Sequence, residues 1–116
     1  MNDTEIAQIA YEAIRNYCIV SDDGLKHTPW DESPEWVKTS FTAGVRWLRL
    51  HPKALSLFSA DNHNHWLNDR KSKGWKWGEI KDISKKENPC IVPYDELPPY
   101  QVKKDNLFKA IVGILN

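Results

Sequence analysis

The chain has 116 residues, a length that fits one domain (1–116) and leaves no room for a second hydrophobic core. Apolar residues make up 41% of the chain and charged residues 28%, which argues against wholesale disorder. Sixteen basic and sixteen acidic side chains cancel, which argues against a protein that binds nucleic acid through its bulk charge.

The first half of the chain predicts two helices joined by a loop. Over residues 3–18, apolar side chains recur at three- and four-residue steps, and acids near the start suit the positive end of a helix dipole. Residues 21–32 are dense in Asp, Ser, Gly and Pro, which predicts a loop. Ser33 as N-cap and Pro34 at the first helical position then predict a second helix, which a later proline stops after about Leu50.

The second half predicts two more helices. Ser59 or Asp61 is expected to cap a third helix. This helix should end at about Ser72, because Gly74 follows and glycine suits the position just past a helix end. Turn-forming residues then lead into a last helix over about 99–114, where apolar side chains line up on one face.

Between the third and fourth helices the pattern changes to two short strand-like pieces. Residues 75–77 and 90–92 are rich in β-prone side chains, and we expect them to pair as a small ribbon packed against the helices. The predicted fold class is therefore mainly α: a compact helical domain of about four helices with a small two-stranded β element.

The cysteines and the hydropathy pattern predict where the protein works. Cys18 and Cys90 are too few for a disulfide scaffold and lack zinc-site spacing, so both are expected to be reduced in an intracellular protein. No apolar run approaches the ~20 residues that span a bilayer. The acidic, polar N-terminus lacks the features of a signal peptide. We therefore expect a cytoplasmic protein without a membrane partner.

Familiar catalytic motifs are missing from the sequence: it has no GxSxG, no phosphate-binding glycine loop and no HExxH. His63 and His65 would point apart on a helix, so we expect no metal site. Asp95 and Glu96 suggest acid–base chemistry, but adjacent acids before a Pro-Pro helix start more often cap and turn the chain. The sequence therefore predicts neither an enzyme nor a cofactor.

Charge and tryptophan are distributed in a way that suggests contact with a ligand or partner. Residues 1–35 carry eight acids and two bases, whereas residues 36–116 carry eight acids and fourteen bases. The six tryptophans are about four times the usual share. A small domain does not need six indoles to fold, so at least one of them is a candidate contact residue.

The most informative segment runs from Gly74 to Gly78 and contains two tryptophans. In a strand, Trp75 and Trp77 would face the same side and form a two-ring platform. Flat rings beside lysines suit the stacking of a base and the neutralisation of a phosphate. The alternative is that both indoles cover the core while the nearby lysines are solvated.

An ordered series of short motifs follows along the second half of the chain. They are Gly74-Trp75-Lys76-Trp77-Gly78, Asp82, Lys85-Lys86, Asn88-Pro89-Cys90, Val92-Pro93-Tyr94 and Leu97-Pro98. This series strongly resembles the ryanodine-receptor repeat, or Ryr domain. Upstream, His63-Asn64-His65-Trp66 resembles the H-x-x-W stretch that precedes this series in the family. Pro34-Glu35-Trp36 looks like the first part of the stand-alone prokaryotic and viral form, so the resemblance extends over about residues 5–115.

The resemblance implies a mostly helical domain with a non-enzymatic role. Free-standing microbial members are suspected of sensing nucleotide-derived ligands. Carried over to this chain, that role falls on Trp75, with Lys85, Lys86 and Tyr94 as helpers.

Two hypotheses follow for the function. In the first, the protein is a ligand-binding module for a nucleotide or nucleotide-derived molecule: Trp75 stacks the base, Trp77 walls the pocket, and Lys85 and Lys86 meet phosphate. In the second, it is a protein-interaction or scaffolding domain without a small-molecule ligand. Its exposed tryptophan surface and opposite charges would then dock a protein partner or a second copy, giving a homo-oligomer.

Overall fold

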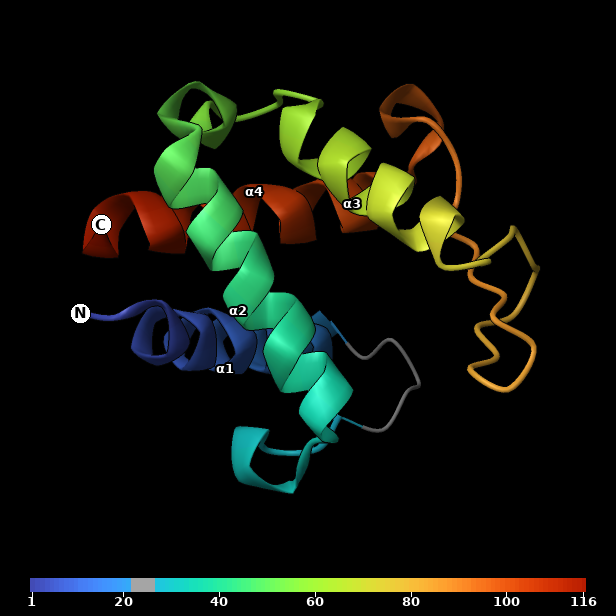
Figure 1. The fold of residues 1–116 in the computed structure, drawn as a ribbon, viewed down its shortest axis with the longest axis horizontal. Coiled ribbons are helices and arrows are strands. Elements are labelled where there is room, and N and C mark those ends of the chain that lie inside the picture. The colour runs from blue at the N-terminus through green and yellow to red at the C-terminus, as the bar shows by residue number, and fades with distance from the viewer. Residues whose placement is uncertain (22–26) are drawn as a thin grey trace.

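The computed structural model of the protein describes residues 1–21 and 27–116, and this part is mainly helical (Figure 1). Its α-helices are α1 (Asp3–Ser21), α2 (Glu35–Leu50), α3 (Asp61–Ser72) and α4 (Pro99–Leu115). Short 3-10 helices are η1 (Trp30–Glu32), η2 (Pro52–Leu55) and η3 (Tyr94–Glu96). The four predicted helices are thus confirmed. Part of the predicted loop 21–32, residues 22–26, lies outside the described residues.

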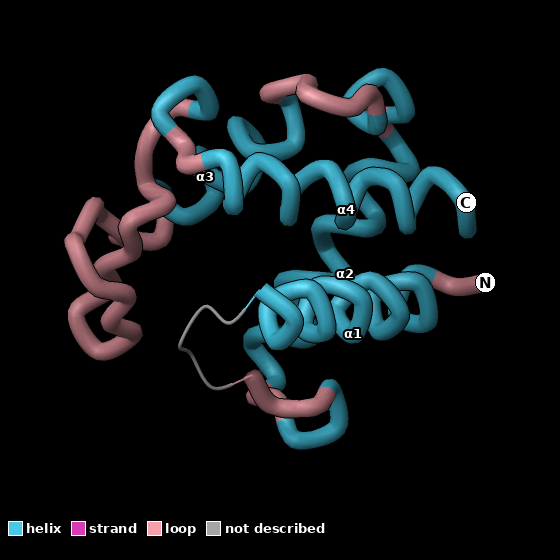
Figure 2. The backbone as a smooth tube through the Cα atoms, turned by 180° about the vertical axis from the view of Figure 1, so that it is seen from behind, coloured by secondary structure: helices cyan, strands magenta, loops and turns pink. Residues whose placement is uncertain are grey.

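The core lies where α1, α2 and α4 pack on one another (Figure 2). Its largest fully buried apolar side chains are Ile6 from α1, Val45 and Leu48 from α2, and Val112 from α4. Burial of such chains supplies the main favourable term in folding. In the part of the chain that the structure describes, no helix is both long and apolar enough to cross a bilayer.

The predicted helix caps are corrected at two starts. Ser33 does not cap α2, because its buried hydroxyl donates to the Tyr11 hydroxyl at 2.7 Å and contacts the Pro29 carbonyl. Pro34 occupies the cap position instead, without a side-chain hydrogen bond. At the start of α3 the cap residue is Ala60, although the neighbouring Ser59 hydroxyl accepts a hydrogen bond from the Asp61 N–H at 3.3 Å.

The predicted end of α3 is confirmed, and it positions a tryptophan. Gly74 has φ +89°, a left-handed conformation that glycine adopts without strain. The Gly74 N–H donates to the Lys71 carbonyl and the Trp75 N–H to the Arg70 carbonyl, which is the hydrogen-bond pattern of a Schellman motif. This turn folds Trp75 back toward the last turn of α3.

The predicted two-stranded β element is wrong. The described residues contain isolated bridges but no strand: Lys76 pairs with Glu87, and Asp82 also pairs with Glu87. The predicted second strand, residues 90–92, begins in a tight turn in which the Ile91 N–H donates to the Asn88 carbonyl. This segment is therefore not extended and cannot pair with residues 75–77. Residues 76–87, called the bridge loop below, project on the side of the molecule away from both termini (Figure 1).

Candidate functional site

An arginine lies among three tryptophan rings at the junction of α2, α3 and the bridge loop. The guanidinium carbon of Arg70 is 5.8 Å from the ring centroid of each of Trp36, Trp66 and Trp75. These four residues, called the Arg70 cluster below, come from α2, α3 and the turn after α3. The Arg70 Nη2 also donates to the Ser40 hydroxyl at 2.6 Å. The side chain is therefore fixed from four directions.

The rings hold the arginine in a charged, oriented state. Cations within about 6 Å of an indole centroid are attracted by about 0.5–2 kcal/mol per ring, with the larger values where water is excluded. Burial lowers the pKa of Arg70, and the Asp69 carboxylate opposes that shift. An arginine nevertheless stays protonated in proteins, so the cluster presents a preorganised positive charge.

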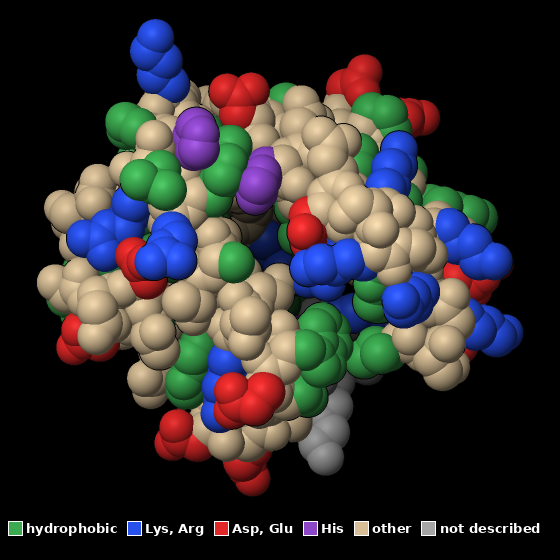
Figure 3. All heavy atoms as spheres, in the orientation of Figure 1, with side chains coloured by type: hydrophobic (Ala, Val, Ile, Leu, Met, Phe, Trp, Pro, Cys, Tyr) green, Lys and Arg blue, Asp and Glu red, His purple; other side chains and the backbone are tan. Residues whose placement is uncertain are grey.

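Two cavities meet at the Arg70 cluster. A small one of about 140 Å³ lies against Trp75 and Lys81, and a larger one of about 710 Å³ extends between α2, α3 and α4. Figure 3 shows the surface hollowed between α2 and α3, with basic side chains at the edge. The two cavities share five lining residues, and each has others of its own. The shared residues are Trp36, Ser40, Phe41, Trp66 and Arg70. Arg70 therefore stands where the two spaces join.

Further cations surround this junction. Lys81 lines the small cavity and Lys104 the larger one. Loss of surrounding water lowers the pKa of Lys81, although the residue is exposed as a whole; the charges of Lys104 and Arg70 lower it further, and Cys90 opposes them. An anion placed among these groups would relieve their mutual repulsion. The arrangement therefore suits an anionic ligand.

The acids at the rim of the larger cavity are already engaged. Asp105 lies 3.0 Å from the buried Lys109 amino group and accepts from the Asn62 amide at 2.7 Å. Asp69 pairs with Lys73 at 3.0 Å. These pairs neutralise the carboxylates, so the positive charge of the Arg70 region dominates the electrostatics of the cavity wall.

The structure separates the two tryptophans that the sequence analysis placed on one platform. Trp75 is half-buried and lines the small cavity. Trp77 is 55% exposed and lines neither cavity, because residues 75–77 do not form a strand in which both rings would share a face. Of the predicted pair, only Trp75 belongs to the cavity wall.

The three predicted helper residues also lie outside the two cavities. The Lys86 amino group donates to the Lys73 carbonyl at 2.9 Å, and Lys85 is exposed on the bridge loop. The Tyr94 hydroxyl is buried, and no hydrogen-bond partner for it lies among the described residues. Burial and the Asp105 charge raise the pKa of Tyr94. A ligand role for these side chains stays a prediction.

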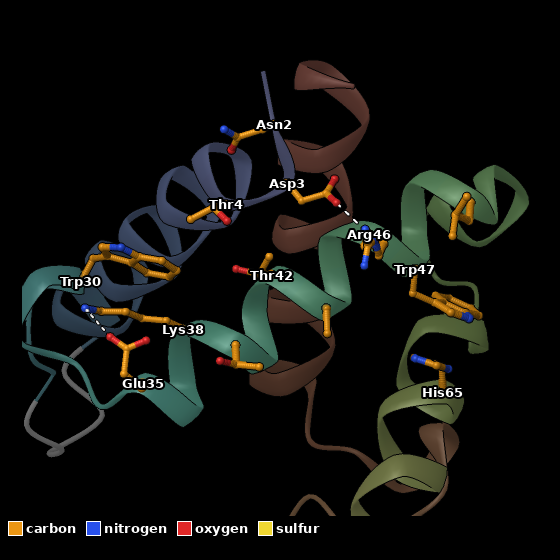
Figure 4. A pocket seen from close by; sticks show the side chains of 13 residues that line it. Asn2, Asp3, Thr4, Trp30, Glu35, Lys38, Thr42, Arg46, Trp47 and His65 are labelled. Atoms are coloured by element: carbon orange, nitrogen blue, oxygen red, sulfur yellow. Dashed lines mark ion pairs between the residues drawn. The ribbon is translucent and has the colours of Figure 1, made fainter.

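A third cavity, of about 800 Å³, lies along the opposite side of α2 (Figure 4). Two ion pairs flank it, Arg46 with Asp3 and Lys38 with Glu35, each at 3.6 Å. Its charged groups thus neutralise one another. We therefore take the cavities at the Arg70 cluster as the candidate site.

The two histidines that the sequence analysis considered for a metal contact different neighbours. His63 is buried, with Nε2 2.7 Å from the Val92 carbonyl oxygen. His65 stacks on Trp47 with ring centroids 4.3 Å apart. Within residues 1–21 and 27–116, no three His, Cys, Asp or Glu side chains are grouped as metal ligands would be.

Most of the site was not predicted from the sequence. Arg70, Trp36, Trp66 and Lys104 were not among the predicted ligand contacts. One signal was available: Trp66 and Arg70 are four residues apart on a helix, as are Trp36 and Ser40, so each pair shares a helix face. That two such faces meet depends on the packing of α2 and α3.

The chain was compared with models of protein families. The model of the RyR domain matches residues 42–112, which is more than half of the chain. The matched range holds Trp66, Arg70, Trp75, Lys81 and Lys104, whereas Trp36 and Ser40 precede it.

Proposed function

Because this chain belongs to the RyR domain family, we propose that it is a non-enzymatic binding module whose ligand is a nucleotide or a nucleotide-derived small molecule. The observation that carries the proposal is the Arg70 cluster at the junction of two cavities. Aromatic walls with a few convergent polar groups are typical of small-molecule sites.

Each part of the site has its own role in this binding. Trp75 stacks the base, and Trp36 and Trp66 wall the space around it, since base–aromatic stacking tolerates any base. Arg70 meets the phosphate, because a guanidinium matches phosphate oxygens in a two-pronged geometry.

Lys81 and Lys104 supply further positive charge for the phosphate. We assign them the phosphate contact that the sequence suggested for Lys85 and Lys86. Lys81 and Lys104 line the cavities, whereas Lys85 and Lys86 do not.

The chemistry of the cavity wall favours binding over catalysis. Cys90 lines the larger cavity, but burial raises the pKa of its thiol, and the opposing charges of Lys104 and Lys81 are the smaller effects. A protonated thiol is a poor nucleophile at neutral pH. We propose no reaction step for this residue.

A thermal-shift panel tests the proposal. Wild-type protein is heated with adenosine, AMP, ADP, ATP and inorganic phosphate as the probes. A ligand at 100 times its Kd stabilises the folded state by about 2.7 kcal/mol, so at least one phosphate-bearing nucleotide should raise Tm by several degrees.

Two variants make the panel specific. Arg70→Gln should lose the shift, because it removes the charge at the cavity junction. The matched control Lys53→Gln, at an exposed position of η2, should keep it. The absence of any nucleotide shift in the wild type would contradict the proposal.

A second candidate function, a protein-interaction domain, is favoured by a different observation. The bridge loop exposes three large apolar side chains, Trp77, Ile80 and Ile83. These residues line neither of the cavities at the Arg70 cluster, so ligand binding does not account for them.

A further inference from the structure

The bridge loop carries three exposed apolar side chains, called the apolar triad below. Trp77 is 55% exposed, Ile80 77% and Ile83 56%. Single exposed apolar residues are normal on protein surfaces, but three within seven residues of one projecting loop form a group. Tryptophan is also the residue most enriched at the centres of protein interfaces.

Hydrogen bonds within the loop fix the position of this triad. The Lys76 N–H donates to the Lys86 carbonyl, and Asp82 and Glu87 exchange two backbone hydrogen bonds of 2.9 and 3.0 Å. A Cβ on Gly78 would lie 2.5 Å from the Glu87 Cβ, so only glycine allows this close approach. A surface fixed in this way loses little entropy when a partner binds.

The bridge loop that carries the triad has more basic than acidic side chains. Lys76 and Lys85 are both exposed. Of the three acids in the loop, Asp82 accepts from the Ser84 hydroxyl at 2.6 Å and Glu87 pairs with Lys76 at 3.8 Å, whereas Glu79 is exposed. Four lysines against these three acids leave the loop with a net charge of +1. The loop therefore presents apolar side chains flanked by lysines.

A surface of opposite charge is formed by η1 and the start of α2. Asp31, Glu32 and Glu35 are exposed, and the Trp36 ring beside them is 40% exposed. We call these four residues the acidic patch. Glu35 pairs with Lys38 at 3.6 Å, and its side chain is 88% exposed, so it stays accessible to a partner. The patch thus offers carboxylates and an indole to a partner.

The acidic patch and the bridge loop flank one opening of the molecule. Trp36 from the patch and Lys81 from the loop line the same small cavity. A partner that covers this opening would therefore meet both surfaces. If that partner is a second copy related by a two-fold axis, the loop of each copy meets the patch of the other, and both contacts form at once.

From this arrangement we infer that a second copy of this chain docks on this face, with the bridge loop of each protomer on the acidic patch of the other. Charge complementarity carries the choice of occupant, because the basic loop and the acidic patch belong to the same chain and lie beside the same cavity. The inference goes beyond the proposed ligand site and does not depend on it.

Charge reversal tests this pairing. One variant, Lys76→Glu with Lys85→Glu, makes the loop acidic, and a second, Glu32→Lys with Glu35→Lys, makes the patch basic. Analytical ultracentrifugation at 50 mM salt should show wild-type dimers whose dissociation constant rises at least tenfold at 500 mM salt, where screening shortens the range of charge interactions. Each variant alone should be monomeric, because like charges then face each other twice.

The decisive sample is an equimolar mixture of the two variants. Each acidic loop then meets a basic patch, and each wild-type loop meets a wild-type patch, so mixed dimers should form while neither variant dimerises alone. The matched control Lys53→Glu with Lys103→Glu has the same charge change on other exposed lysines and should dimerise as the wild type does. Circular dichroism checks that every variant keeps its helices.

Four results would overturn the inference. The first is a monomeric wild type at all concentrations up to 0.5 mM, and the second is a mixture of variants that stays monomeric. The third is a wild-type monomer that instead sediments with vesicles of anionic phospholipid through Trp77, Ile80 and Ile83, because the loop would then serve a lipid surface. A control variant that loses dimerisation would equally contradict the assigned surfaces.

Discussion

The three-helix core and the segment from α3 through η3 are stabilised in different ways. The core of α1, α2 and α4 buries a continuous apolar cluster that includes Val45, Leu48 and Val112. In the segment of residues 61–98, only Leu67 and Ile91 are buried apolar side chains. That segment is fixed instead by ring contacts, ion pairs and hydrogen bonds, such as the one between His63 and the Val92 carbonyl.

This difference indicates that the core mainly stabilises the fold, whereas the segment of residues 61–98 mainly serves binding. The fully buried core side chains Val45, Leu48 and Val112 pack on one another and line neither cavity of the candidate site, so they contribute to folding and not to ligand contact. The α3 segment carries rings and charges whose polar ends remain at cavities, as at Trp66 and Arg70. We therefore expect core variants to change folding and segment variants to change recognition.

The largest expected effect is a truncation in the core. Leu48→Ala should lower the free energy of unfolding by about 2–5 kcal/mol, because a fully buried leucine leaves a cavity behind. Urea denaturation measures this change. The same kind of truncation in the segment, Ile80→Ala, should stay within about 0.5 kcal/mol, because the side chain is exposed. An equal loss in the free energy of unfolding for the two variants would contradict the proposed difference between the two regions.

The next prediction compares the effect on stability of replacing two glycines with alanine, one in the bridge loop and one on α4. Gly78→Ala should destabilise the protein by about 1–3 kcal/mol, because the new methyl group would overlap Glu87. Gly113→Ala on α4 is the control: nothing lies within 4 Å of the added Cβ, and alanine favours helices by about 1 kcal/mol, so stability should rise. Thermal melts of both variants should shift in opposite directions, and a stabilising Gly78→Ala would contradict the loop geometry.

A third prediction concerns recognition. Trp75→Ala should weaken nucleotide binding by about 1–3 kcal/mol, the range for loss of base stacking. Its cost in folding should stay below that of a buried aromatic truncation, about 3–5 kcal/mol, because the ring is half-buried. Calorimetric titration with ATP and urea denaturation separate the two effects. Trp77→Ala should leave ATP affinity unchanged, and an equal loss there would place the ligand outside the small cavity.

The smallest effect concerns pH. Burial lowers the pKa of His65 below its ordinary value of 6.5; the Asp69 charge opposes this shift and the His51 charge adds to it. The folded state thus binds this proton less readily than the unfolded state does. The contribution of His65 to stability is complete above pH 6.5 and is lost as the pH falls through 6.5 toward the lowered pKa.

Melts between pH 7.5 and pH 5 check this sign. The wild type should lose up to about 0.5 kcal/mol more than His65→Phe, which keeps a ring on Trp47 without a titrating group; the effect is small because His65 is exposed. A larger acid loss in His65→Phe than in the wild type would reverse the predicted sign.

The sequence predicted the helices well because their signals are local. Apolar spacing marked α1 and α4, and Gly74 marked the end of α3. The β element failed because pairing depends on a partner: Lys76 bridges Glu87, eleven residues on, rather than the 90–92 segment. A strand propensity in three residues cannot specify which segment it meets.

The chemical character of the site was predicted from the sequence better than the residues that form it. An aromatic, basic site near Trp75 was expected, and Trp75 lines a cavity. The lysines next to it in sequence, Lys85 and Lys86, lie elsewhere on the loop, and the cation at the junction is Arg70, on the preceding helix. Three rings from three segments surround that guanidinium, and such a meeting depends on tertiary packing.

One titration tests the central claim, that Arg70 at the cavity junction recognises a phosphate. Wild type and Arg70→Gln are titrated calorimetrically with AMP and with adenosine, after circular dichroism shows that both are folded. Wild type should bind AMP more tightly than adenosine. Arg70→Gln should lose about 1.5–3 kcal/mol of AMP binding, the contribution of a hydrogen bond to a charged group, and should bind adenosine as before. Equal AMP affinity in the two proteins would contradict the account.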